Sequence, residues 1–222
     1  MDDKEQRAVV IGPTIIASVA GVSLQDDRDV TDCTQLALWT ANQKFDRFSE
    51  PDDWFTQYAA ALKFLGWVPY KDSTFHRTYD DFSGSVIQAY LKKMTGRDDN
   101  PLNRALNNTL IDTFDAIEPD KPALLSLDQE SLNGQQFQIA PVQYDARGQL
   151  TMLVSQFSLL SSIKVQEFLF QKWDRKSASL FEQVGAFILD RSKLETNRAF
   201  LDKRISEIRM TRFRLKMRSS RE

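Results

Sequence analysis

The chain has 222 residues and a formal net charge of −2, and its 41% hydrophobic and 27% charged residues are typical of a globular protein and exclude a disordered one. Its single cysteine, Cys33, and single histidine, His76, exclude a disulfide framework and any zinc site built from several such ligands. A run of 18 apolar residues, which a membrane-spanning helix requires, does not occur.

The N-terminal apolar run, Val9 to Val22, superficially resembles part of a signal peptide. Acidic residues precede it, however, and Gly12-Pro13 interrupts it, which argues against secretion by that route. We therefore expect the protein to be cytoplasmic as synthesised. Export by a route that needs no standard signal peptide stays open.

The first half of the chain shows the start and stop signals of helices. Ser23 to Asp26 forms a capping box that predicts a helix reaching about Asn42, and Pro51 begins a second helix that Gly66 ends. Apolar residues three and four positions apart continue this pattern to about residue 117. The predicted helices cover about residues 23–42, 49–66, 83–94 and 100–117, with one strand within residues 67–79.

The chain changes character after Pro122 and becomes rich in β-favouring residues. Gly148 lies where a short hairpin loop needs a residue with positive φ, and apolar runs follow at hairpin spacing. The parity of the apolar residues switches near Glu167, which predicts a bulge. The four strands expected are a segment ending near residue 144 and the segments 150–161, 163–173 and 179–189.

The fold class predicted from these elements is α+β, with N-terminal helices packed on a four-stranded antiparallel β-meander. Residues 150–160 carry apolar side chains on both faces, which is typical of a central strand covered on both sides. We expect a single domain over residues 1–202, with a helical half at about 23–117 and a meander at about 135–189. The core is predicted to join Trp54, Tyr58, Leu62, Leu65 and Trp67 to Phe137, Ile139, Met152 and Val154.

A C-terminal helix is predicted from Asp190 to about Met210. Residues 203–222, which include the end of this helix, form a basic amphipathic tail. Eight basic residues between Lys203 and Arg221 oppose Glu207 alone, so this segment carries +7 and the remainder of the chain −9. Such a split favours an arm for an anionic partner or a tail that folds back on the acidic body, although a solvated tail also fits.

We expect the chain beyond Met210 to be exposed, so that removing it leaves the melting temperature nearly unchanged. Its anionic partner is a lipid surface, a nucleic acid or an acidic protein, because alternating apolar and basic residues suit all three. The residues predicted to bind this partner are Arg209, Arg212, Phe213, Arg214, Lys216 and Arg218.

Motifs for catalysis are sparse. The sequence lacks a nucleophile elbow and a phosphate-binding glycine loop, and helix capping explains most of its paired carboxylates. We predict no catalytic residue, no metal and no cofactor. One enzymatic alternative centres on His76 with Asp80 or Asp81.

Residues Asn42 to Val68, with Phe45-Asp46-Arg47-Phe48, Pro51, Trp54, Tyr58 and Leu65-Gly66-Trp67, resemble a family of uncharacterised bacterial and fungal proteins. The resemblance extends over roughly residues 30 to 190 and implies no activity. At the level of fold alone, helices over an antiparallel meander are similar to cytolysins of the Cyt type.

These observations favour a non-enzymatic binding or assembly protein, including one that acts at membranes as a pore-forming toxin does. The alternatives are a nucleic-acid-associated protein that uses the basic tail and an enzyme of unrecognised type centred on His76.

Overall fold

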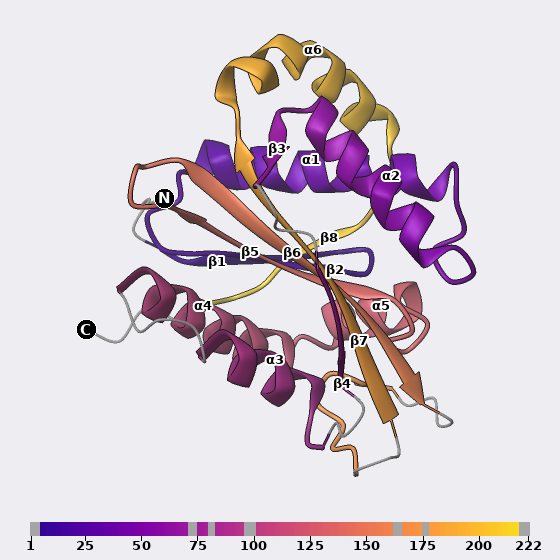
Figure 1. Ribbon diagram of the computed structural model, residues 1–222. Coiled ribbons are helices and arrows are strands. Elements are labelled where there is room, and N and C mark those ends of the chain that lie inside the picture. The colour runs from indigo at the N-terminus through magenta and orange to yellow at the C-terminus, as the bar shows by residue number, and fades with distance from the viewer. Residues whose placement is uncertain are drawn as a thin grey trace.

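A computed structural model describes residues 5–70, 75–79, 83–95, 101–161, 166–174 and 178–217, and it places one sheet between two layers of helices (Figure 1). The helices are α1 (Leu24–Asn42), α2 (Pro51–Phe64), α3 (Val86–Thr95), α4 (Pro101–Ile117), α5 (Lys121–Glu130) and α6 (Arg191–Glu207). The strands are β1 (Arg7–Ile11), β2 (Thr14–Ser18), β3 (Trp67–Pro69), β4 (Phe75–Tyr79), β5 (Phe137–Tyr144), β6 (Leu150–Ser161), β7 (Ala178–Leu189) and β8 (Arg212–Arg214).

The sheet is larger than the predicted four-stranded meander. Its order is β3-β7-β6-β5-β2-β1-β8, with β4 paired to β7 alongside β3, and β2 runs parallel to β5. Strands β5, β6 and β7 are antiparallel neighbours as expected. The strand predicted over residues 163–173 is wrong, because the chain forms a turn around Glu167, whose φ of 57° is left-handed. The α+β class is therefore right and the meander is not.

A hairpin of β1 and β2 accounts for the N-terminal apolar run. Ile11 pairs with Thr14 across a two-residue loop in which Gly12 has a φ of 52°. Glycine at the first position of a two-residue loop is typical of a type II′ turn, whose twist suits a hairpin. Gly12-Pro13 thus makes the turn, and the sequence reading that saw it only as an interruption missed two strands.

Helix starts and stops follow the sequence closely. Ser23 caps α1 by accepting a hydrogen bond of 3.0 Å from the backbone N–H of Asp26, and α1 ends at Asn42 as expected. Gly66 follows α2 with a φ of 102°, a conformation that favours glycine. Helix α5 was not predicted, and the single strand expected over residues 67–79 is two separate strands, β3 and β4.

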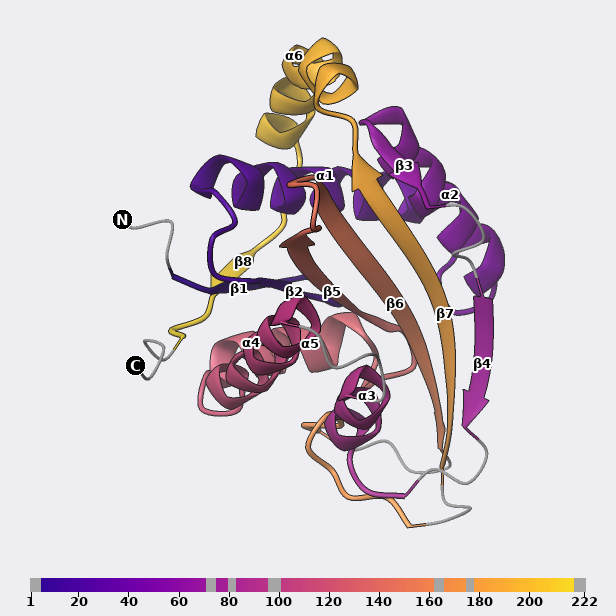
Figure 2. The same ribbon diagram turned by 60° about the vertical axis from the view of Figure 1, so that its left-hand side comes forward.

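Two cores lie on opposite faces of the sheet. Figure 2 shows α1, α2 and α6 over one face and α3, α4 and α5 over the other. Alternation along β6 divides the apolar residues, because Met152 and Val154 join the first core and Phe157 and Leu159 join the second. The prediction that residues 150–160 form a central strand is confirmed, but helices cover both faces only over the first part of that strand, since Leu160 is 57% exposed.

The predicted contacts between the halves are right for one face only. Trp54 is 0% exposed and packs in the same core as Met152 and Val154. Phe137 and Ile139 instead belong to the core under α3, α4 and α5. Their odd-numbered positions on β5 point away from α2, so the single core expected from the sequence is two.

The segment after α6 folds back onto the sheet. Strand β8 pairs antiparallel with β1, and the backbone N–H of Leu215 donates to Ala8 O at 3.0 Å. Leu215 is 7% exposed. The exposure predicted for the chain beyond Met210 is therefore wrong at these residues, because the sheet supplies backbone partners and the core takes an apolar side chain.

Candidate functional site

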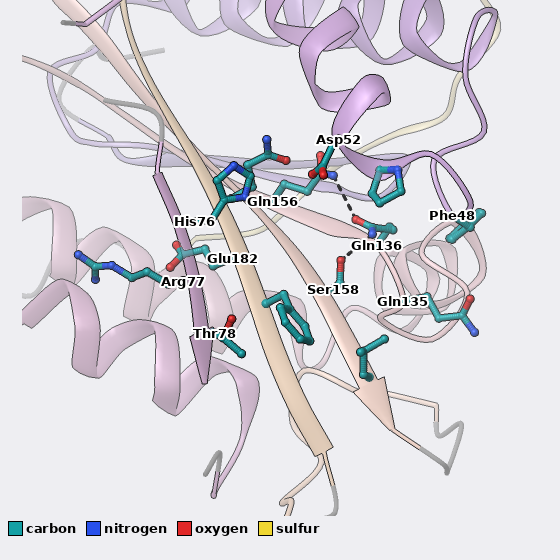
Figure 3. A pocket seen from close by; sticks show the side chains of 14 residues that line it. Phe48, Asp52, His76, Arg77, Thr78, Gln135, Gln136, Gln156, Ser158 and Glu182 are labelled. Atoms are coloured by element: carbon teal, nitrogen blue, oxygen red, sulfur yellow. Dashed lines mark hydrogen bonds between the residues drawn. The ribbon is translucent and has the colours of Figure 1, made fainter. Parts of the chain in front are cut away.

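A cleft of about 420 Å³ opens on the face of the sheet that α1 and α2 only partly cover (Figure 3). Its floor is formed by β4, β6 and β7, and the start of α2 with the residues just before it forms one wall. We call it the glutamine cleft. It is lined by Phe48, Pro51, Asp52, His76, Arg77, Thr78, Gln135, Gln136, Gln156, Ser158, Leu160, Phe181, Glu182 and Gln183.

The floor arises from strand alternation beyond the end of the helical cover. The even-numbered residues of β6 begin as core residues, Met152 and Val154, and continue on the same face as Gln156, Ser158 and Leu160. Side chains on a strand keep to one face at every second position, so the core pattern runs directly into the cleft. Polar residues replace apolar ones where the helices no longer cover the sheet.

A row of polar side chains crosses the sheet at this level. Gln138 is paired with Gln156, Gln156 with Gln183, and Gln183 with His76. Residues directly opposite each other on neighbouring antiparallel strands share a face and lie close enough for their side chains to interact. Three glutamine amides and one imidazole therefore lie side by side across β5, β6, β7 and β4.

The amides form a hydrogen-bond chain that ends in the cleft. Thr14 Oγ1 donates to Gln138 Oε1 at 2.8 Å, and Gln138 Nε2 donates to Gln156 Oε1 at 3.3 Å. Gln156 Nε2 donates to Gln136 Oε1 at 3.2 Å, and Gln136 Nε2 donates to Ser158 Oγ at 2.6 Å. Hydrogen bonds in such a chain polarise one another, which leaves the Ser158 hydroxyl a strengthened donor toward the cleft.

Three further polar side chains of the cleft have no partner among the described residues. Within the described part of the chain, no hydrogen bond or ion pair engages the side chains of Asp52, His76 or Gln183. Gln183 belongs to the cross-strand row but stands outside the chain of amides. Together these side chains offer a carboxylate, an imidazole and an amide to a ligand.

Apolar surfaces flank these polar groups. Leu160 is 57% exposed and Phe181 is 38% exposed, and both line the cleft with Phe48 and Pro51. Large apolar side chains are more often buried, so their gathering beside a polar row is typical of a binding site with one apolar wall.

The charged groups of β4 and β7 at this level are turned to the opposite face. Lys93 of α3 pairs with the buried carboxylate of Glu182, which also accepts a bond of 3.0 Å from Tyr79 Oη. Burial, together with the charge of Glu182, raises the pKa of Tyr79 to about 12. Figure 3 shows the guanidinium of Arg77 directed away from the glutamine row. Arg77 is the one basic residue in the described lining, and its charge lies away from the glutamine row.

The predicted partner-binding residues lie elsewhere. Strand β8 forms one edge of the sheet and β3 and β4 form the other, so the tail and the glutamine cleft are separate. Arg212 reaches Asp32 at 2.6 Å, while Arg214 lies 4.0 Å from Asp27. Phe213 packs partly against the core, Arg209 and Lys216 are exposed, and Arg218 lies outside the described residues.

Ion pairs hold α6, which leads into the basic C-terminal segment, against the acidic residues of α1. Asp26 of α1 receives a two-bond contact of 2.6 and 2.8 Å from Arg191 of α6, and one turn later Asp29 pairs with Arg198. Burial would raise the pKa of Asp26, but the hydrogen bonds donated by Arg191 and other neighbours hold it below its ordinary value. Of the alternatives that the charge split left open, the tail that folds back matches the contacts of Arg212 with Asp32 and of Arg214 with Asp27.

The described residues bring no carboxylate into contact with His76 that would support the enzymatic alternative. His76 is exposed on β4, and Asp80 and Asp81, its proposed partners, lie outside the described residues. In the described ranges, no group of three or more metal-ligating side chains is arranged to hold an ion. Burial raises the pKa of the Cys33 thiol to about 12, which leaves it unreactive. Among the helices described here, none is long and apolar enough to cross a bilayer.

Sequence reading missed the glutamine cleft, although part of its signal was present. Along residues 152–158 the even positions read Met, Val, Gln and Ser, so one face changes from apolar to polar within a single strand. That change indicates where the cover ends. The pairing of Gln138, Gln156, Gln183 and His76 comes from sheet register, which the sequence of one strand does not contain.

Comparisons with known proteins show a loose likeness of fold. A solved delta-endotoxin structure superposes with a TM-score of 0.46 at 13% identity, covering 79% of this chain and 80% of that one. The Evf virulence factor gives a TM-score of 0.41 at 9% identity, covering 93% of this chain and 83% of that one. No family model and no curated protein matches the chain. At scores below 0.5 no activity follows from either likeness.

Proposed function

We propose that this chain is a non-enzymatic binding protein that holds a small, uncharged, hydrogen-bonding ligand in the glutamine cleft. The observation that carries the proposal is the amide chain from Thr14 to Ser158, which ends at a hydroxyl inside the cleft. Glutamine amides offer hydrogen-bond donors and acceptors without charge, and each donor or acceptor of a buried amide needs a hydrogen-bond partner. A site of about 420 Å³ lies in the usual range for small ligands, roughly 300 to 1,000 Å³.

The test is a titration of the ¹⁵N-labelled protein with a library of neutral polar small molecules, followed through its glutamine side-chain resonances. We expect saturable shifts of Gln136, Gln156 and Gln183. Gln183→Ala and Ser158→Ala should each weaken binding about tenfold, since a hydrogen bond contributes about 1 kcal/mol and an unpaired partner costs more.

The matched control is Gln171→Ala, which removes an exposed side-chain amide that donates to Lys172 O and lies outside the cleft. This variant should bind as the wild type does. Shifts confined to residues outside the cleft, or binding that survives both cleft substitutions, would contradict the proposal.

The basic C-terminal segment supports a second candidate function, attachment to an anionic membrane surface. Arg209 and Lys216 are exposed, and no ion pair within the described residues engages either side chain. Basic residues near an anionic leaflet contribute about 1 kcal/mol each, and salt screens them. A pore-forming version of this function would also release vesicle contents.

Sedimentation with phosphatidylserine vesicles at low salt tests this candidate. The double variant Arg209→Gln, Lys216→Gln should lose most of its retention, whereas Lys44→Gln, Lys63→Gln, which removes two exposed lysines elsewhere, should keep it. Equal retention of both variants would show that the C-terminal segment is not the binding element.

A further inference from the structure

We infer that the ligand of the glutamine cleft is a saccharide, an inference that rests on the proposed function. A pyranose combines a ring of hydroxyls with an apolar face of C–H groups, and the cleft presents both kinds of partner. Each hydroxyl is at once donor and acceptor, as is each glutamine amide.

The polar groups of the cleft suit neighbouring hydroxyls. The Ser158 hydroxyl, polarised by the amide chain, is a donor, and the amide of Gln183, which has no partner among the described residues, adds a donor and an acceptor one strand away. Asp52 faces this floor from α2, and its two carboxylate oxygens accept from two adjacent hydroxyls. His76 extends the row at the outer edge.

The apolar wall suits the C–H face of the sugar ring. Phe181 is paired with both Ser158 and Thr78, so its ring lies on the cleft floor beside the hydroxyl donors. Phe48 lines the cleft from the residues before α2. A ring that stacks on either aromatic side chain keeps its hydroxyl edge toward the polar row.

Charge disfavours the main competing ligands. Phosphate and carboxylate groups are usually bound by arginine, lysine or a helix N-terminus. In the described lining, Arg77 points away from the glutamine row and Asp52 adds a negative charge at the start of α2. Nucleotides and phospho-sugars would therefore meet repulsion, while a neutral saccharide would not.

The experiment titrates the full-length ¹⁵N-labelled protein with methyl glucoside, methyl mannoside and methyl galactoside, and in parallel with adenosine and adenosine monophosphate. We expect at least one glycoside to shift the side-chain resonances of Gln156 and Gln183, and adenosine monophosphate to shift neither. Asp52→Asn and Phe181→Ala should each weaken that glycoside at least tenfold. Leu132→Ala, which removes an exposed apolar side chain outside the cleft, should leave it unchanged.

The outcomes distinguish failure of the saccharide inference from failure of the proposed function. Shifts with adenosine or another neutral molecule of the library but with no glycoside would overturn the saccharide inference and leave the proposed function standing. Shifts with no compound at all would overturn both. Glycoside binding that Asp52→Asn and Phe181→Ala leave intact would also overturn the inference, because the sugar would then lie outside the glutamine cleft.

Discussion

Two acidic residues of α1 show how burial and pairing compete at the scale of a single carboxylate. Arg191 and its neighbours outweigh burial at Asp26 and hold its pKa below the ordinary value. At Asp32 burial outweighs Arg212, and the pKa is raised. The charged form thus stabilises the folded protein at Asp26 and costs stability at Asp32.

Asp26→Asn should lower the free energy of unfolding at pH 7 by about 1.5 to 3 kcal/mol, since it removes charged hydrogen bonds. Because the folded pKa of Asp26 is lowered, its contribution is present above the unfolded pKa of about 3.9 and is lost as pH falls through the folded value. Denaturant titrations between pH 5 and 3 should therefore show a smaller acid-induced loss for the variant than for the wild type.

Asp32→Asn is the matched control, because Asp32 lies on the same helix as Asp26 and its carboxylate also pairs with an arginine, Arg212. The pKa of Asp32 is shifted upward, opposite to that of Asp26, so neutralising Asp32 should lower the free energy of unfolding by less than about 1 kcal/mol at pH 7. An equal loss of unfolding free energy in the two variants would contradict the opposite balance of burial and arginine pairing at Asp26 and Asp32.

At the scale of elements, β8 decides whether the basic segment is an arm or part of the fold. Removing the chain after Met210 deletes β8, exposes the edge of β1 and removes Leu215 from the core. Loss of one buried leucine alone costs about 2 to 5 kcal/mol. The nearly unchanged melting temperature expected from the sequence is therefore replaced by a fall of at least about 4 °C, as 1 kcal/mol is worth roughly 2 to 4 °C in a chain of this size.

Calorimetry of two truncations checks this expectation. A chain ending at Met217 keeps β8 and Leu215 and should melt as the full-length protein does, whereas one ending at Met210 should not. If the two melted at the same temperature, β8 would contribute nothing to the fold.

At the scale of the whole molecule, the cover over the sheet determines where a ligand can bind. Helices α1, α2 and α6 shield one end of their face, and α3, α4 and α5 shield the opposite face (Figure 2). The far ends of β6 and β7 extend past the first layer, so the same alternation that places Val154 in a core places Gln156 and Ser158 on the polar floor of the cleft.

The sequence by itself determined the local elements whose signals are contained in a few adjacent residues. The helix cap at Ser23, the stop at Gly66 and the hairpin glycine Gly148, with a φ of 73°, are all present in the structure, although the N–H of Ser23 bonds to Tyr144 and not to Asp26 as a full capping box requires. These signals work because a cap or a turn depends on backbone geometry within about four residues.

Tertiary structure alone decided the parallel pairing of β2 with β5, the docking of β8 and the row of Gln138, Gln156, Gln183 and His76. Each joins segments far apart in the chain. Their register follows from which faces the helices bury, and the ion pairs of Asp26 and Asp29 with α6 depend on how the layers meet. A periodic pattern states which residues share a face but not which strand lies beside it, because pairing is set by the packing of the whole sheet.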